Sequence, residues 1–258
     1  MADESAKLIV YRNNDPWYEL PVTEFDRYDE ETGYYIYTVD LVAKEMADSV
    51  VSKVVTDDYN TFFNRVSLAG YCERILSDPV TYANEQDIVK AMLNYGAASQ
   101  VYFGYNSNDL ANKNIGKVDM DAVPVGGDPA VVTGDEIGIN YYGASLVMNS
   151  KISLRLYFEL ADGADIKDYT FSVGYPVASK ITADRSGYRV EIENIAPNML
   201  AKDYSLQITK DGETMTITYS PMDSIQRQYH TGASQSLNNM LQALYNYHLA
   251  ALAHTPAV

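Results

Sequence analysis

The chain has 258 residues, of which 47% are hydrophobic and 21% charged, as is typical of a globular protein long enough for two cores. The net charge of −16, without any cluster of Lys and Arg, excludes a nucleic-acid partner because nothing could displace the counterions of a phosphate backbone. Direct membrane insertion is excluded too, since no uninterrupted apolar run is long enough to span a bilayer.

Strands are predicted first along the chain. Four segments are rich in β-branched and aromatic residues and are separated by turn residues such as NNDP and YDEETG. They are residues 7–12, 17–24, 32–41 and 50–55. The pattern is typical of β-strands.

A helical hairpin is predicted next. Ser67 stands where an N-cap is expected, an apolar helical stripe follows it over residues 68–76, and a second helix is predicted over 85–103. Cys72 lies in the first stripe and is the only cysteine, so no internal disulfide can form. We expect it to be a small buried hydrophobe rather than a nucleophile.

The second half repeats this order at greater length. Eight short strand-like segments are predicted over residues 135–143, 144–150, 152–160, 168–174, 178–184, 187–195, 203–210 and 213–220, and two helices over 220–230 and 234–254. The sequence predicts an α+β fold with two tandem units. Each unit is an antiparallel β-sandwich of immunoglobulin-like type followed by a helical hairpin. The first unit covers residues 1–105 with a truncated front, a linker covers 106–130, and the second unit covers 131–258.

The two halves also match in sequence. At an offset of about 154 residues, Gly33-Tyr34 falls on Gly187-Tyr188, and at slightly smaller offsets Arg74 falls on Arg227 and Tyr95 on Tyr247. Nothing before Lys7 corresponds to residues 135–150. Residues that both copies share are expected to belong to the scaffold, and residues that differ are the better places to look for function.

Tyrosine is the most informative residue type for function, with 23 in the chain. The strand period of two predicts that Tyr34 and Tyr188 point inward, whereas Tyr35 and Tyr37 point to solvent. An exposed ring can pack on the C–H face of a sugar while amides and carboxylates bind its hydroxyls. Packing between strands is the alternative role for the same rings.

Six aromatic residues are the candidate ligand-binding residues. They are Trp17, Tyr18, Tyr35, Tyr37, Tyr105 and Tyr142. For Trp17, a half-buried core anchor and an exposed stacking residue are both open.

Catalytic machinery is not evident. The three histidines lie in the final helical region without a metal-binding spacing, and the nucleophile-elbow, P-loop and dinucleotide fingerprints are lacking. The acidic segment with Glu24, Asp26, Asp29, Glu30 and Glu31 could hold calcium but lacks the EF-hand spacing. We therefore predict no catalytic residue, no metal site and no obligatory cofactor.

A family resemblance follows from longer stretches. The hairpin AMLNYGAASQVYFGYNSNDLAN, the segment VDLVAKEMADSV and the run YYGASLVMNSKISLRLYFEL resemble modules of very large secreted and cell-surface proteins of anaerobic gut Clostridia of the ruminococcal type. The resemblance spans nearly the whole chain. It implies a secreted or cell-surface location as part of a larger protein, and it implies no activity.

These observations favour a non-catalytic extracellular module that binds polysaccharide, such as starch or a plant glucan, through surface aromatics. The alternative is a structural spacer or adhesion module that binds a host or bacterial surface protein. A glycoside hydrolase is the third hypothesis, because it needs only two converging carboxylates among the 35 acidic residues.

Overall fold

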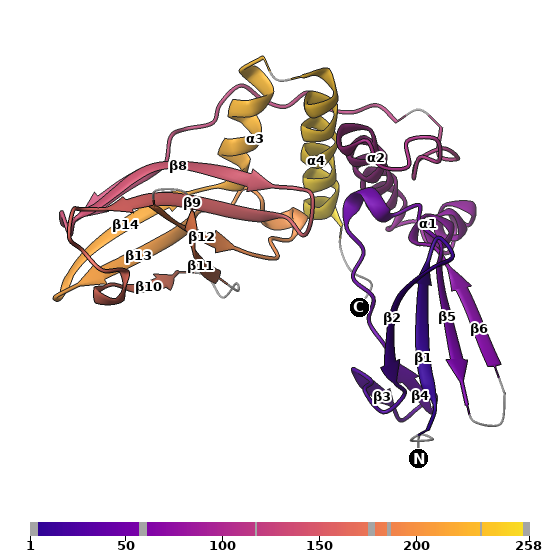
Figure 1. The fold of residues 1–258 in the computed structure, drawn as a ribbon. Helices are drawn as coiled ribbons and strands as arrows, with labels where there is room; N and C mark the ends of the chain where they lie inside the picture. Colours follow the sequence, from indigo (N-terminus) through magenta and orange to yellow (C-terminus); the bar gives the residue numbers. More distant parts are fainter. Residues whose placement is uncertain are drawn as a thin grey trace.

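The computed structural model describes residues 5–56, 61–116, 118–174, 179–184, 187–232 and 234–254, the side chains of 61–63 excepted. Its described sheets are all antiparallel and are accompanied by α-helices, as Figure 1 shows. The mixed, antiparallel architecture predicted from the sequence is confirmed at this level. No helix among the described residues has both the length and the apolar character needed to cross a bilayer.

The first half contains one four-stranded sheet, in the order β2-β1-β5-β6, and a separate hairpin made of β3 and β4. The strands are β1 (Lys7–Arg12), β2 (Asp15–Pro21), β3 (Arg27–Asp29), β4 (Tyr34–Ile36), β5 (Val50–Val55) and β6 (Thr61–Val66). The predicted NNDP turn joins β1 to β2, with Asn13 and Asn14 both at positive φ. The predicted first sandwich is therefore one sheet with a small core of Leu8, Val10 and Val50.

The second half is a two-layer β-sandwich. One sheet has the order β10-β13-β14-β7 and the other the order β11-β12-β9-β8. The strands are β7 (Val131–Gly134), β8 (Ile139–Val147), β9 (Ser153–Leu160), β10 (Thr170–Val173), β11 (Ser179–Asp184), β12 (Gly187–Ile192), β13 (Tyr204–Lys210) and β14 (Glu213–Tyr219). Alternate residues such as Leu156 and Ile208 are fully buried between the sheets. This strand order differs from that of immunoglobulin constant domains, in which the first strand pairs with the second.

The described part of the chain has four α-helices, with α3 beside β8 of the sandwich and α1 at the end of the first sheet (Figure 1). They are α1 (Leu68–Ser77), α2 (Gln86–Phe103), α3 (Pro221–His230) and α4 (Gln235–Ala253). The equivalent residues Tyr95 and Tyr247 meet where α2 packs on α4, with ring centroids 6.2 Å apart. Cys72 is buried in this core, and burial raises the pKa of its thiol to about 11, as expected of an inert hydrophobe.

Ser67 and Ser220 cap equivalent helices. Ser67 Oγ accepts a hydrogen bond from Gly70 N at 3.0 Å, and Ser220 Oγ accepts one from Asp223 N at 3.1 Å. We expect Ser67→Ala and Ser220→Ala each to lower the free energy of unfolding by about 1 kcal/mol, since each leaves a first-turn N–H without its partner. Urea denaturation measures the loss. Ser150→Ala in an exposed loop is the control, and a loss no larger than the control's would refute the caps.

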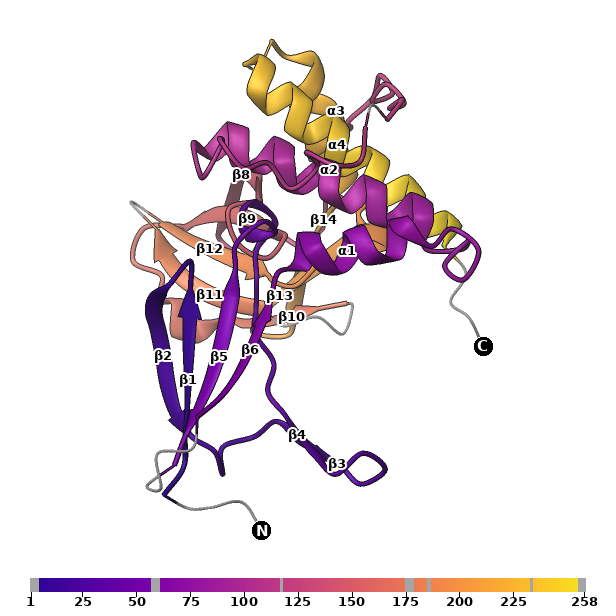
Figure 2. The ribbon, with the colours of Figure 1, turned by 90° about the vertical axis from the view of Figure 1, so that its right-hand side faces the viewer.

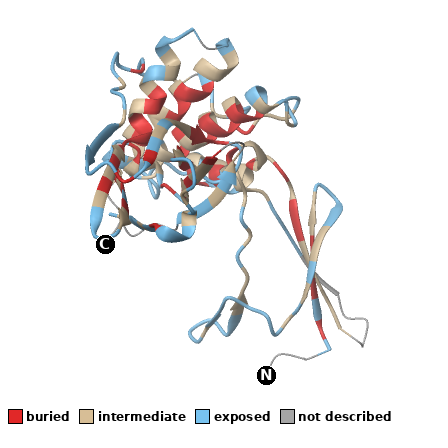
Figure 3. Cartoon of the chain, turned by 60° about the vertical axis from the view of Figure 1, so that its left-hand side comes forward, coloured by how far each residue is buried: buried red, intermediate tan, exposed pale blue. Residues whose placement is uncertain are grey.

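The described residues of the predicted linker, 106–116 and 118–130, are irregular in structure and pack along the helices. Gln100 Oε1 accepts a hydrogen bond from Ala111 N at 2.8 Å, and Asn246 Nδ2 donates one to Asp121 O at 2.9 Å. Ala111 and Val123 are buried in one core cluster that spans both halves. The two halves thus share a core, which Figure 3 shows concentrated in the helices and the sandwich.

The repeat reappears in the strand pairing. The β3–β4 pair Tyr28↔Tyr35 corresponds to the β11–β12 pair Thr182↔Arg189 at the same offset of 154 residues. Within the described first half, no strand takes the place of β7, β8 or β9. The β3–β4 hairpin consequently projects from the molecule, as Figure 2 shows.

The prediction that Tyr34 points inward is wrong. Tyr34 is 70% exposed, whereas Tyr188 packs on Phe158 with ring centroids 6.0 Å apart. The physical reason is the shortened first half: β12 pairs with β9 and lies over a core, whereas β4 pairs only with β3.

Candidate functional site

Three of the six predicted binding residues pack against the core of the first sheet. Trp17, Tyr18 and Tyr37 are half-buried there, and burial raises the pKa values of Tyr18 and Tyr37. The guanidinium of Arg12 lies over the Trp17 ring, 4.7 Å from its centroid. Tyr37 donates a hydrogen bond to the carbonyl of Val22. Packing therefore occupies much of the ring surface that a ligand would need.

Tyr105 belongs to a charged cluster at the end of the first sheet. Its hydroxyl donates to Asp48, which is fully buried, and Arg12 Nη1 bonds Glu45 Oε1 at 2.8 Å. Desolvation, followed by the hydrogen bond to Asp48, raises the pKa of Tyr105 to about 12. This cluster joins the sheet to the segment after α2, which is a structural role.

The raised pKa of Tyr105 gives a pH prediction. The folded state holds the phenolic proton more tightly than the unfolded state, whose tyrosines titrate near pH 10. The stabilisation is therefore fully present below about pH 10 and is lost as the pH rises toward about 12. We expect Tyr105→Phe to flatten this part of the stability profile, as measured by urea unfolding at stepped pH. Tyr82→Phe is the control, and an unchanged slope in Tyr105→Phe would contradict the assignment.

Tyr35 lies in an aromatic group on the projecting hairpin. Its ring centroid is 4.9 Å from that of Phe25 and 5.0 Å from that of Tyr28, and Phe25 and Tyr28 are both exposed. The cross-strand pair Tyr28↔Tyr35 places these two rings on one face of the hairpin. We call Phe25, Tyr28 and Tyr35 the hairpin platform. Its counterparts in the second half include Thr182 and Arg189, so the platform is specific to the first copy.

Tyr142 lies on β8, in the sheet with the order β11-β12-β9-β8. It is the extra residue of a β-bulge between Tyr141 and Gly143, and it is 49% exposed. Its ring centroid is 6.0 Å from that of Tyr157, which is half-buried on β9. The Tyr157 hydroxyl lies 2.8 Å from Ser145 Oγ. The Tyr142 ring therefore lies beside Tyr157 on the neighbouring strand, at the bulge.

Polar side chains continue this face toward the end of the sandwich. Asn140 pairs with Glu159 across β8 and β9, two residues along β9 from Tyr157 and therefore on the same face. We call Asn140, Tyr142, Tyr157 and Glu159 the sandwich site. Its two rings, amide and carboxylate come from a rigid pair of long strands.

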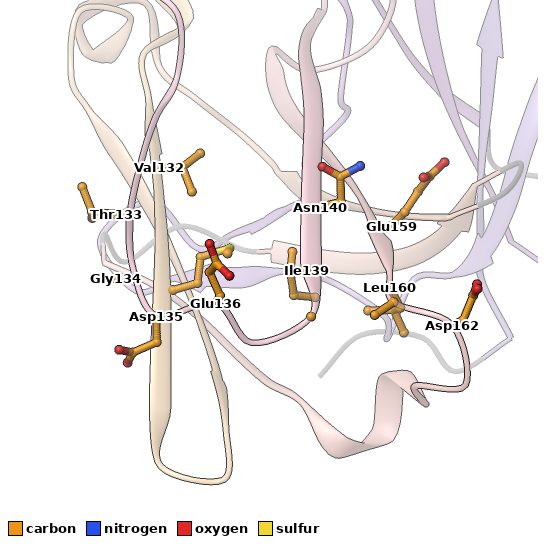
Figure 4. Close-up of a pocket in the computed structure, with 13 residues that line it drawn as sticks. Val132, Thr133, Gly134, Asp135, Glu136, Ile139, Asn140, Glu159, Leu160 and Asp162 are labelled. Atoms are coloured by element: carbon orange, nitrogen blue, oxygen red, sulfur yellow. The ribbon is translucent and has the colours of Figure 1, made fainter.

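A hollow of about 740 Å³ opens beside Asn140 and Glu159. Figure 4 shows these two side chains on neighbouring strands, with Glu136 and Asp162 on other parts of its wall. The Asp135 carboxylate in the same hollow accepts a hydrogen bond from Thr214 N at 2.9 Å and so helps to hold the wall. The sandwich site thus adjoins a concave, acidic surface.

Ion pairs order the strands next to the sandwich site. Arg155 Nε bonds Glu191 Oε2 at 2.9 Å between β9 and β12, and Arg189 Nη1 bonds Asp184 Oδ2 at 3.0 Å between β12 and β11. Arg189 is also the direct cross-strand neighbour of Tyr157. These partly buried ion pairs link β9, β12 and β11 on this face.

The acidic segment predicted as a possible calcium site uses its carboxylates in turns. Asp26 accepts a hydrogen bond from Thr38 N, and Asp29 Oδ1 accepts one from Glu31 N at 3.0 Å. In the described ranges, no three His, Cys, Asp or Glu side chains converge as metal ligands would. Calcium binding by this segment stays a prediction.

Of the candidate residues chosen from the sequence, Tyr142 and Tyr35 belong to these two aromatic groups, whereas Asn140, Tyr157, Glu159, Phe25 and Tyr28 were not among the candidates. The alternating pattern of residues 152–160 marks Tyr157 and Glu159 as sharing one face, and this signal was present. Their meeting with Asn140 and Tyr142 depends on the bulged β8–β9 register.

Comparison with known proteins adds no identity. No protein-family model matches the chain, and no curated protein matches it.

Proposed function

We propose that this protein is a non-catalytic polysaccharide-binding module, with starch or a plant glucan as its ligand. The observation that carries the proposal is the sandwich site, where two tyrosine rings lie 6.0 Å apart beside Asn140 and Glu159. The hairpin platform offers a second aromatic surface for the same kind of ligand.

The chemistry of the sandwich site suits a sugar. Ring faces attract the apolar C–H face of a pyranose. An amide can both donate hydrogen bonds to its hydroxyls and accept them, and a carboxylate accepts them. The adjoining hollow, of about 740 Å³, lies within the size range of small-molecule sites. An acidic protein favours a neutral polysaccharide over a polyanionic one, because the net charge of −16 repels anions.

The setting we propose is extracellular, at the cell surface or secreted, as part of a larger protein. Support comes from the resemblance of the helical hairpin and of residues 141–160 to ruminococcal surface modules. Two aromatic surfaces on one chain would let a long polysaccharide bind in two places, which raises the overall affinity without any stronger single contact.

Affinity electrophoresis tests the proposal. The chain is run in native gels containing soluble starch, mixed-linkage β-glucan or xylan, beside a non-binding marker protein. We expect retardation in at least one glucan gel and none in the polymer-free gel. Equal mobility in every gel would overturn polysaccharide binding and leave the spacer or adhesion role as the better proposal.

The hydrolase hypothesis has a specific observation of its own, since Asp135, Glu136, Glu159 and Asp162 all line the hollow. A pair of carboxylates at a suitable separation is what glycoside hydrolysis requires. Release of reducing ends from a retained glucan, abolished in Glu159→Gln, would establish hydrolysis. Retardation without any release would leave binding alone.

A further inference from the structure

The first half of the chain has a groove between a strand edge and a helix. In the second half, the equivalent space is filled by backbone of the chain itself. A hollow of about 500 Å³ lies between the edge of β6 and α1, lined among others by Ser49, Asn64, Arg65, Gly70 and Arg74. The strand order β2-β1-β5-β6 leaves the outer edge of β6 unpaired in the described sheet. We name this hollow the edge groove.

The repeat identifies the equivalent place in the second half. The β5–β6 pair Val51↔Arg65 corresponds to the β13–β14 pair Ser205↔Thr218, so β6 matches β14 residue by residue. Helix α1 matches α3 at the same offset of 153 residues, with Arg74 on Arg227. The edge groove therefore corresponds to the space between the outer edge of β14 and α3.

That space is filled by residues 126–134. Strand β7 pairs antiparallel with β14, with Val131 opposite Thr218 and Val132 opposite Ile217. The residues just before β7 lie against α3: Asp128 N donates to Asp223 Oδ1 at 3.1 Å, and Arg227 Nη2 donates to Asp128 O at 2.5 Å. Gly127 lies so close that a Cβ there would be 2.6 Å from Asp223 O. An extended backbone thus fits this geometry tightly.

The residues of β6 are more exposed than their counterparts in β14, since the described first half has neither a strand like β7 nor a second sheet like β11-β12-β9-β8. Val66 is 47% exposed, whereas its counterpart Tyr219 is buried. Asn64 is exposed, whereas its counterpart Ile217 is completely buried. Arg65 and Arg74 add positive charge to the groove of an otherwise acidic protein.

We propose that the edge groove binds an extended segment of another polypeptide, which adds to β6 as a strand in the way that β7 adds to β14. The segment would carry alternating apolar residues for the strand and an acidic residue near Arg65 and Arg74. Backbone hydrogen bonds to a sheet edge give such binding its affinity, and side-chain pockets give its specificity. The internal copy defines both the direction and the register of the added strand.

A peptide spanning residues 124–136 of this chain, PVGGDPAVVTGDE, is the probe, labelled and titrated into the full chain by fluorescence anisotropy. We expect saturable one-to-one binding that a scrambled peptide does not show. The main-chain groups of Thr214 on β14 face β7, since Thr214 O accepts a hydrogen bond from Asp135 N at 2.9 Å. Main-chain groups of alternate residues face the same side of a strand, so those of Thr218 also face β7. Arg65 is the counterpart of Thr218, and its N–H is therefore expected at the free edge of β6.

Two variants and one matched control decide the outcome. Arg65→Pro removes the edge N–H without breaking the pairing with β5, and should abolish binding. Arg74→Ala is a milder test on the helix and should weaken binding about tenfold by removing a charge-assisted hydrogen bond. Arg227→Ala, at the equivalent place in the second half, should leave binding unchanged. Absence of peptide binding would overturn the proposal. Loss of peptide binding in Arg227→Ala alone would also overturn it, because the peptide would then be displacing β7.

Discussion

The double variant Tyr142→Ala/Tyr157→Ala is expected to lose at least tenfold in affinity for the retained polysaccharide. Each ring is a partly exposed tyrosine on a rigid strand, and truncating a tyrosine at the centre of a binding surface costs about 1–2 kcal/mol. Two such losses correspond to a factor of about 30 to 1,000 if they add. Affinity electrophoresis at graded polysaccharide concentrations measures the dissociation constant directly.

The matched variants distinguish the removal of a binding ring from unfolding of the protein. Tyr142→Phe keeps the ring face and should retain most of the affinity, and Tyr82→Ala removes an exposed ring outside both aromatic surfaces. Thermal unfolding of each variant should stay close to the parent. If Tyr82→Ala weakened binding as much as the double variant, the sandwich site would not be the binding surface.

Phe158→Ala is expected to give the largest loss of stability, about 3–5 kcal/mol. Phe158 is completely buried between the two sheets, and its ring lies 5.6 Å from Phe171 and 6.0 Å from Tyr188. Truncation leaves a cavity that rigid strands on both sides cannot close. Urea unfolding followed by circular dichroism measures the change.

Phe25→Ala is the matched control for Phe158→Ala. Phe25 carries the same side chain on the exposed hairpin platform, where removal should cost less than about 1 kcal/mol. Equal losses in the two variants would show that the sandwich core does not hold the molecule together.

Local signals in the sequence predict much of the secondary structure. The Ser67 cap and the Asn13-Asn14 turn each occur where local chemistry places them. These features depend on residues within one turn of one another. The irregular structure of the segment 106–130 could be predicted for the same reason, but its packing against α3 and α4 could not.

Long-range pairing explains what the sequence did not predict. The alternation of residues 34–38 resembles that of 188–192, yet Tyr34 is exposed because its hairpin has no third strand. The alternation of apolar residues shows which side chains of a strand can be buried. It does not show whether another strand is present to cover them. The first sandwich was predicted wrongly for this reason.

The candidate site shows the same division. Tyr142 could be chosen from the sequence as one of two adjacent tyrosines with opposite orientations. Its partners Tyr157 and Glu159 come from β9, and only the bulged register brings them beside Asn140 and Tyr142. The rings of Trp17 and Tyr37, in contrast, pack against the core of the first sheet.

Hydrogen exchange with and without a soluble oligosaccharide of the retained polysaccharide tests the central claim most directly. At saturating ligand, we predict slower exchange of amides in β8 (Ile139–Val147) and β9 (Ser153–Leu160), with weaker protection in the β3–β4 hairpin. Helices α1 and α2 should exchange as in the free protein. Protection confined to those helices, or none anywhere at saturation, would contradict a sugar-binding sandwich site.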